Sequence, residues 1–561
     1  MAAADIAQPC RLLSLPDELK LHIVNYLDVR RDLYNVSRTC RTLEDTTMAR
    51  LYHDVDLSLS EAKASGTPLL RAPVTQSVRH ITLRNERTRK RATESPSQHE
   101  QVNQLLDIIP AGRLISFLLL HHTALTAQTL ELLIHRHGTT LQSLAFCELA
   151  SALEPTVVPS NLTSLECRTI NDGEGVEKIM SANTNTLQRI YLGQEKPLLM
   201  GYHRSRFGSL ERIPQPKDTF FTAAFAVGNM PRLRDLSLSG IDLIPLRPSS
   251  IPQIEFFCCL ERLSLESCPG TAEFLDLLAT GFGWVTHSPD APQNPRTLPS
   301  LKHFFLRHES PTAALKDALV HFTTSFTGLQ TLSLLFENAT ILERPSTLIA
   351  GHGPTLRTLV LEARIQPREH LGLDTSRPFG AGGYSSDVWV DTIDDIARLC
   401  PNLEQLGMGF PWSDEMVRLR KTSLPALAGL KTMHVRNFPE NRLHSQVGDY
   451  TIKEYATKFI EWAFPQISVH CKPSLEHLAI GPTIHESRWK MGFGGGGDGV
   501  GVRSLPQKIP EFLRTHHFCL DWAQTRFGRW SPLITPVSEK FMEETTGEKP
   551  LKGVFEPVWL K

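Results

Sequence analysis

The sequence lacks an apolar run long enough to span a bilayer, and its first residues, MAAADIAQPCRLLSLPDE, lack the basic segment and apolar core of a secretory signal. Charge of one sign is also missing, because 59 basic residues and 60 acidic residues leave a formal net charge of −1. This balance gives no general attraction to nucleic acid or to anionic membranes. We therefore expect an intracellular protein, cytoplasmic or nuclear, that binds neither nucleic acid nor membrane.

The common signatures of catalysis and of metal binding are absent as well. The sequence has no GxSxG, HExxH or Walker A motif, and its 10 cysteines include no CxxC pair. The adjacent pairs His121–His122 and His516–His517 direct their side chains to different faces of a strand or helix, which suits one shared metal ion poorly. We expect no catalytic residue, no metal and no cofactor, so the chain is not expected to be an enzyme. The least favoured alternative is an enzyme with its active site in the long insertions between repeats.

Two short segments invite a functional interpretation that their context does not support. The run GFGGGGDGVG at 492–501 has the glycines of a phosphate-binding loop, but no Lys-Ser or Lys-Thr follows it. We assign residues 486–505 to a Gly-rich linker. The basic run RNERTRKR at 84–91 is short and contains Glu86, which favours an exposed loop over a targeting or anion-binding segment.

The sequence is rich in one phrase, L-x-x-L-x-L, which returns with small variations. Successive copies are separated by 21 to 28 residues or by 41 to 47, which is one or two periods of a repeat of about 20 to 29 residues. In each copy the first leucine anchors the chain, and the later two point to the same side of a short strand. The copies begin at Leu141, Leu162, Leu187, Leu233, Leu260, Leu301, Leu329, Leu356, Leu403, Leu430 and Leu475, with two earlier variants at Val78 and Leu114.

The segments that precede these phrases have the spacing of amphipathic helices. Leu130, Leu133 and Ile134 share one face of a helix that would end at Gly138. The joints RHGTTLQSL and GHGPTLRTL are nearly identical, so one helix-to-strand connection is used twice. Residues 76–485 are therefore predicted to form an α/β solenoid, with parallel strands on one face and helices and loops on the other. They resemble leucine-rich repeats of the cysteine-containing and ribonuclease-inhibitor types, but irregularly, since no Asn or Cys recurs at a fixed place after the strand.

Two short amphipathic stretches near the N-terminus recur nowhere else in the chain. The apolar positions of the first are Leu15, Leu19, Ile23 and Leu27. Those of the second are Leu33, Val36, Cys40 and Leu43. Each set has the spacing of one helix face, so each stretch is expected to form one helix, with a third short segment at 46–52. These stretches are too short to form a core alone, so their apolar faces are expected to be buried against something else.

The same residues carry a resemblance to a known family. The stretch LPDELKLHIVNYLDVRRDLYNVSRTCRTL is similar to the F-box, which opens with Leu-Pro, continues through Glu-Leu and an Ile four residues on, and ends with Cys-Arg. It departs from many F-boxes in having Leu43 where they have Trp. The resemblance covers residues 12–55, roughly a tenth of the chain.

The resemblance implies a function and a set of contacts. F-box proteins with leucine-rich repeats are substrate-recognition subunits of SCF-type cullin–RING E3 ubiquitin ligases: the F-box binds the Skp-family adaptor, and the repeats bind a protein target. The implied adaptor contacts are Leu15, Pro16, Leu19, Ile23 and Leu27. Leu33 and Cys40 would hold the helices together or extend the interface. Two alternatives stay open: the helices only cap the first repeat, or the chain is a non-catalytic scaffold whose F-box acts outside a ubiquitin ligase.

These inferences divide the chain into six segments and make it a monomer within a hetero-complex. The segments are a flexible N-terminus at 1–11, the F-box at 12–55, a connector at 56–75, the leucine-rich-repeat domain at 76–485, the Gly-rich linker at 486–505, and a C-terminal cap or tail at 506–561.

Overall fold

The structure is a computed structural model in which the chain divides into two compact units. Unit 1 comprises Met1–Glu195 with Arg212–Leu233, and unit 2 comprises Lys196–Glu211 with Arg234–Lys561. The expected flexible N-terminus at 1–11 and the Gly-rich linker at 486–505 lie outside the described residues. The structure describes residues 14–27, 30–58, 72–84, 96–120, 124–150, 158–170, 173–194, 230–243, 257–287, 299–309, 311–337, 345–364, 386–409, 419–436, 446–447, 450–464, 472–481, 515–526 and 528–538.

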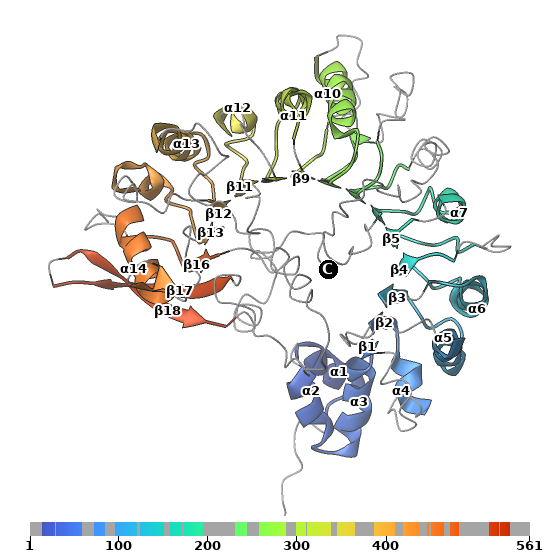
Figure 1. The fold of residues 1–561 in the computed structure, drawn as a ribbon. Helices are drawn as coiled ribbons and strands as arrows, with labels where there is room; N and C mark the ends of the chain where they lie inside the picture. Colours follow the sequence, from blue (N-terminus) through green and yellow to red (C-terminus); the bar gives the residue numbers. More distant parts are fainter. Residues whose placement is uncertain are drawn as a thin grey trace, which may run out of the picture. The chain divides into compact units, whose positions relative to one another are not determined.

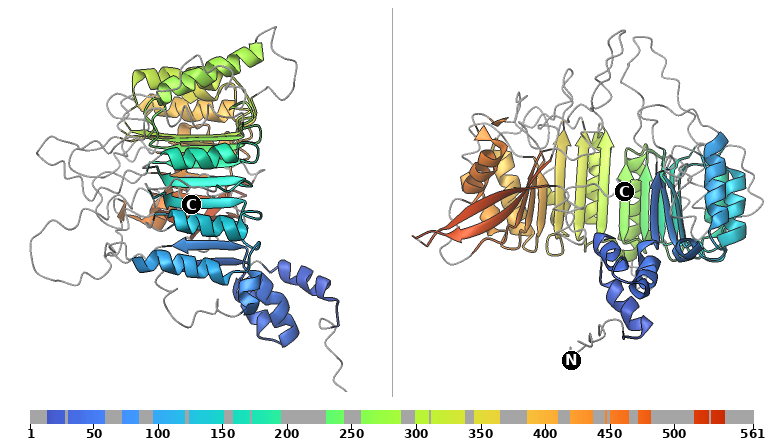
Figure 2. Two further views of the ribbon diagram at one scale, coloured as in Figure 1. Left: turned by 90° about the vertical axis from the view of Figure 1, so that its right-hand side faces the viewer. Right: turned by 90° about the horizontal axis from the view of Figure 1, so that it is seen from below.

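Unit 1 begins with three short helices and continues with strands and helices. Its strands pair side by side in chain order, and every pair is parallel. Helices α5 to α7 lie along one face of these strands (Figure 1, Figure 2). The elements are α1 (Asp17–Asn25), α2 (Arg30–Ser37), α3 (Arg41–Leu51), β1 (Asp54–Ser58), α4 (Ala72–Ser77), β2 (His80–Arg84), α5 (Pro96–Ile108), β3 (Ser116–Leu120), α6 (Ala127–His137), β4 (Ser143–Glu148), β5 (Ser164–Thr169), α7 (Gly173–Ala182) and β6 (Arg189–Gly193).

The leucine phrases supply the buried face of the strands. In the copy that contains β4, Leu141, Leu144 and Phe146 are fully buried. Side chains alternate along a strand, so these apolar residues face the helical side while Ser143 points the other way and is only half-buried. The prediction of a mixed α/β fold built on parallel strands is confirmed for the described residues.

The repeated joint between a helix and the next strand has the same threonine hydrogen bond at both places. Thr140 Oγ1 donates to the first leucine carbonyl of the preceding phrase at 2.8 Å, and Thr355 Oγ1 does the same at 2.7 Å. The histidine of each joint, His137 or His352, is fully buried. Burial lowers the pKa of each imidazole to about 4, so both are neutral at pH 7. The joint therefore ties each helix end to the neighbouring strand through side chains that the sequence repeats.

Unit 2 continues the same alternation of strand and helix. Its strands β7 to β13 and β16 pair parallel in chain order, and β14 and β15 form a separate antiparallel pair. None of the helices in the described part of the chain has the length and apolarity to cross a membrane. The elements are β7 (Asp235–Ser239), β8 (Arg262–Glu266), α10 (Thr271–His287), β9 (His303–Glu309), α11 (Ala313–Thr324), β10 (Thr331–Glu337), α12 (Pro345–Ile349), β11 (Thr358–Arg364), α13 (Ser386–Leu399), β12 (Gln405–Met408), the 3₁₀ turn η5 (Leu424–Ala426), β13 (Thr432–Val435), β14 (Gln446–Val447), β15 (Tyr450–Thr451), α14 (Ile452–Ala463), β16 (His477–Ile480), β17 (His516–Gln524) and β18 (Trp530–Val537).

The last strands of unit 2 leave the parallel pattern. β17 pairs antiparallel with both β16 and β18. Phe518 and Trp522 of β17 are buried, and Trp522 Nε1 donates to the Leu475 carbonyl at 2.9 Å. Opposite them, β18 carries Pro536 and Pro532. This hairpin lies within the segment that the sequence assigned to a C-terminal cap or tail.

Candidate functional site

Helix α1 has an inner face that belongs to a small core. Val24 is buried in a cluster with Leu33 of α2 and Leu51 of α3, and Leu27 packs against that cluster. Lys20 lies on the same side of α1 one turn before Val24 and is also buried, with its Nζ 3.0 Å from Asp17 Oδ1. Three helices are therefore held together by very few apolar side chains.

The opposite face of α1 is apolar and exposed. Leu19 keeps 49% of its surface exposed, Ile23 keeps 42% and Tyr26, just after the helix, keeps 73%. These residues occupy positions i, i+4 and i+7, so they form one stripe along the helix. Leu15 and Pro16 precede this stripe; Leu15 is half-buried, Pro16 is exposed, and the carbonyl of Pro16 accepts the first helical hydrogen bonds.

Exposed apolar side chains are concentrated in this part of the chain. Among the described residues, seven large apolar side chains are exposed, and five of them lie between residues 19 and 34. Because an exposed apolar cluster costs free energy in water, its concentration on one small helical module makes this surface the candidate binding site among the described residues. The five are Leu19, Leu21, Ile23, Tyr26 and Tyr34, and the other two are Ile108 and Leu533.

The structure divides the predicted contact residues into two groups. Leu19 and Ile23 are exposed on the outer stripe, and Pro16 is exposed beside it. Leu27 and Leu33 pack on the inner side, where they hold the helices together. The regular four-residue spacing from Leu15 to Leu27 suggested a single face, but the helix ends at Asn25, so Leu27 follows a different path from the stripe.

The second predicted helix is in fact two helices. α2 ends at Ser37 and α3 begins at Arg41, with Cys40 extended between them at φ −162° and ψ 161°. Ser37 Oγ donates to the Tyr34 carbonyl and Thr39 Oγ1 to the Val36 carbonyl, both at 2.7 Å. Such side-chain bonds compete with the helical backbone and favour termination. Cys40 is half-buried at this turn.

Sequence reasoning missed Leu21, Tyr26 and Tyr34 as surface residues. Tyr34 lies at a position where the amphipathic pattern gives no reason to expect an exposed ring, whereas Tyr26 lies three residues after Ile23. Tyr26 stacks edge-on against His22, with ring centroids 5.1 Å apart, and Arg38 lies over the Tyr34 ring at 5.7 Å. The signal available was the i+3 spacing of Tyr26 from Ile23, since tyrosine is enriched in protein interfaces.

Comparison with known families agrees with this geometry. The sequence matches the F-box-like family over residues 12–58. The match contains α1, α2, α3 and β1, so these elements make up an F-box-like domain. No curated protein matches the chain in sequence.

One group of potential metal ligands follows the helices of the F-box-like domain. The side chains of His53, Asp54 and His80 bring three ligand atoms within 4.8 Å of one another. None of the three was singled out from the sequence, because His80 is brought to the other two only by the pairing of β2 with β1.

Proposed function

We propose that this chain is the substrate-recognition subunit of an SCF-type cullin–RING ubiquitin ligase. Its F-box-like domain binds a Skp-family adaptor, and its strands and helices form an irregular leucine-rich-repeat solenoid that holds a protein target. The chain itself has no catalytic role; it raises the concentration of the target near a ubiquitin-carrying enzyme in the cytoplasm or nucleus. The observation that carries this proposal is the concentration of exposed apolar side chains on the F-box-like domain.

The outer stripe of α1 has the spacing of a helix that docks in an apolar groove. Such helices present anchors at i, i+3 or i+4, and i+7, as Leu19, Ile23 and Tyr26 do. Completing the burial of a half-exposed Leu or Ile contributes on the order of 1 kcal/mol each, and tyrosine adds a large contact area. Because Val24 and Leu27 on the inner side already satisfy the domain's own core, the outer stripe is available to a partner.

The repeat phrases support the solenoid part of the proposal. Each parallel strand from β2 to β16 carries one copy of the phrase or a variant of it, and the leucines of each copy are buried. Side chains between the leucines remain on the surface: Glu261 pairs with Lys302 at 3.0 Å and with Arg234 at 3.8 Å, and all three are exposed by more than two fifths. A charged surface of this kind is what a repeat domain offers to a protein target.

Two buried cysteines are not activated as nucleophiles. Burial raises the pKa of the Cys268 and Cys400 thiols to about 12, so both are neutral at pH 7. A neutral buried thiol is a poor nucleophile.

The direct test is binding of the full chain to a purified Skp-family adaptor by isothermal titration calorimetry. The double substitution Leu19→Ala/Ile23→Ala is expected to weaken binding by roughly 30-fold to 1,000-fold, because two interface anchors are worth about 2 to 4 kcal/mol together. The matched control is Ile108→Ala/Leu533→Ala, which removes two exposed apolar side chains outside the F-box-like domain. The control is expected to bind like the wild type, and circular dichroism reports whether either variant alters the fold.

The outcomes separate the proposal from its alternatives. Equal affinity of the wild type and Leu19→Ala/Ile23→Ala, or no binding by either, rejects the adaptor interface on α1. Co-purification from cells with the adaptor but without a cullin favours a leucine-rich-repeat scaffold whose F-box acts outside a ubiquitin ligase. Co-purification with both, together with target proteins that lose ubiquitin when Leu19 and Ile23 are substituted, supports the receptor role.

A further inference from the structure

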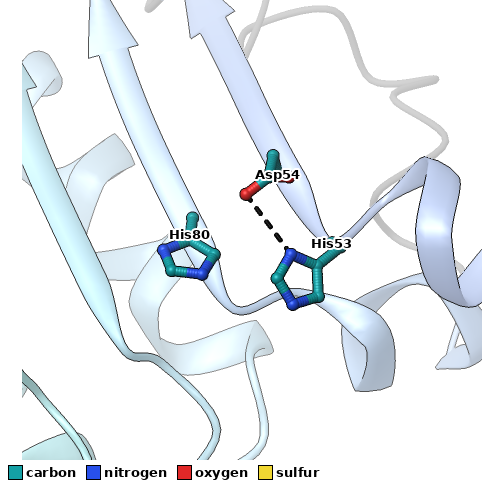
Figure 3. Close-up of side chains that lie close together, drawn as sticks. All are labelled: His53, Asp54 and His80. Carbon is teal, nitrogen blue, oxygen red and sulfur yellow. Dashed lines mark hydrogen bonds and ion pairs between the residues drawn. The ribbon is translucent and has the colours of Figure 1, made fainter. Parts of the chain in front are cut away.

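The strand pairing at the start of the sheet in unit 1 brings together residues that are twenty-seven positions apart. His53 directly precedes β1, Asp54 is the first residue of β1, and His80 is the first residue of β2. In the parallel register Asp54 lies opposite His80, while Val55 and Ile81 point into the core. Figure 3 shows the two imidazole rings side by side, with the Asp54 carboxylate above the His53 ring.

The three side chains already converge on one small volume. His53 Nδ1 lies 3.3 Å from Asp54 Oδ1, and the ring centroids of His53 and His80 are 4.9 Å apart. One ligand atom from each residue lies within 4.8 Å of the other two. The backbone is fixed at this point as well, because the N–H groups of Arg79 and His80 both donate to the His53 carbonyl at 3.0 Å.

This arrangement suits a metal ion that prefers nitrogen with one carboxylate. Two imidazoles and one carboxylate, with water at the remaining positions, are ligands of Zn²⁺ and similar divalent transition ions. Zn–N and Zn–O bonds of about 2.1 Å place ligand atoms roughly 3.4 Å apart, so modest side-chain rotation closes the present group around an ion. The side chains of His53 and Asp54 are 35% and 66% exposed, which leaves access for the ion and for water.

The charge of the group also suits a divalent ion. The ligand atom of Asp54 lies within 4.8 Å of those of both histidines, and its carboxylate supplies the negative charge that such an ion needs.

We propose that His53, Asp54 and His80 form a binding site for a divalent transition-metal ion of the Zn²⁺ type, with water completing the coordination. The ion cross-links the segment that leaves α3 to strand β2, so it fixes the junction between the F-box-like domain and the strands that follow. The site is independent of the adaptor interface, since its residues lie at the starts of β1 and β2 and not on the outer stripe of α1.

The test is a titration of the full, untagged chain with Co²⁺, followed by visible absorption, and then competition with Zn²⁺. The wild type is expected to bind one Co²⁺ more tightly than its scattered surface histidines do, with the intense bands of a low-symmetry site. His80→Ala and Asp54→Asn are each expected to weaken this site at least about tenfold, the scale on which even outer-shell ligand partners act. Zn²⁺ is expected to raise the melting temperature of the wild type and to raise that of Asp54→Asn much less.

The chain contains a matched control. His321 Nδ1 lies 3.1 Å from Asp276 Oδ1 on the surface of unit 2, a comparable His–Asp pair that belongs to no such three-ligand group among the described residues. His321→Ala is expected to leave the tight Co²⁺ site unchanged. Equal titrations for the wild type, His80→Ala and Asp54→Asn would overturn the proposal, as would an equal loss in His321→Ala. Should His80→Ala fail to fold, Asp54→Asn alone decides, because its side chain is largely exposed.

Discussion

The F-box-like helices and the strands of the two units use their apolar residues in opposite ways. In the strands that carry the L-x-x-L-x-L phrase, the large apolar side chains are buried inside the chain, as Leu144 and Leu334 show. In the helices the inner side is buried around Val24, yet Leu19 and Ile23 remain exposed on the other side. The strands therefore bury their large apolar side chains within the chain, whereas the helices leave an apolar surface exposed, and this surface is where we propose that a second protein binds.

The largest effect is expected from a truncation inside the strand phrases. Leu144→Ala removes a fully buried side chain from β4 and is expected to lower the free energy of unfolding by about 2 to 5 kcal/mol, because it leaves a cavity. Urea unfolding followed by circular dichroism measures this loss. Under conditions where the variant is still folded, its affinity for the adaptor is expected to match the wild type. A selective loss of adaptor binding in the folded variant would show that the strands and the F-box-like helices do not act independently.

A somewhat smaller effect is expected from Leu33→Ala, which tests the inner side of the helices. Leu33 packs with Val24 and Leu51, so its truncation is expected to cost about 2 to 4 kcal/mol of local stability and to weaken adaptor binding only through unfolding of the helices. Hydrogen exchange of the amides in α1, α2 and α3 reports that unfolding. If adaptor binding weakens while exchange stays slow, Leu33 is an interface contact and the assignment to the inner side is wrong.

A third effect comes from acid, which acts on the buried imidazole of His352 between α12 and β11. Burial lowers the pKa of His352 to about 4, below the value of about 6.5 expected for an unfolded histidine. The unfolded chain therefore takes up more protons below pH 6.5, and the stability provided by neutral His352 is lost as the pH falls from 6.5 toward 4. The loss is expected to reach roughly 2 to 3 kcal/mol for this residue.

Urea unfolding between pH 7 and pH 4.5 measures the acid effect. His352→Leu is expected to have a shallower pH dependence than the wild type, since it no longer titrates. His22→Gln is the matched control, because His22 is exposed on α1. An identical pH dependence in His352→Leu and the wild type would contradict the role given to the buried imidazole.

The strands were predictable from the sequence because their signal is local and repeated. The phrase that contains Leu141 and Leu144 indicates both the position of a strand and its buried side. The joint around Thr140 recurs almost unchanged around Thr355. Even the weak variants at Val78 and Leu114 turned out to be strand entries of this kind, with both residues buried.

The details of the candidate site were less accessible for physical reasons. Spacing alone placed Leu27 with Leu19 and Ile23, but periodicity does not indicate that a helix ends at Asn25. For the same reason, Leu33 and Cys40 were predicted to lie in one helix, although hydrogen bonds of Ser37 and Thr39 favour a break between them. The group of His53, Asp54 and His80 depends on strand register, which no short stretch of sequence encodes.

The two prolines of β18 have a consequence for association of the chain with itself. The Leu520 N–H points toward β16, because it donates to the Glu476 carbonyl. Every second residue of β17 has this orientation, and the β18 residues paired with them point their own N–H and C=O groups away from β17, toward the open edge. Pro532 and Pro536 lie at positions of this type, and each lacks an N–H. A strand from another copy would find an edge with two donors missing, which discourages polymerisation through strand addition. Two prolines thus weaken the hydrogen-bonding capacity of the β18 edge, whereas the apolar stripe of α1 stays exposed.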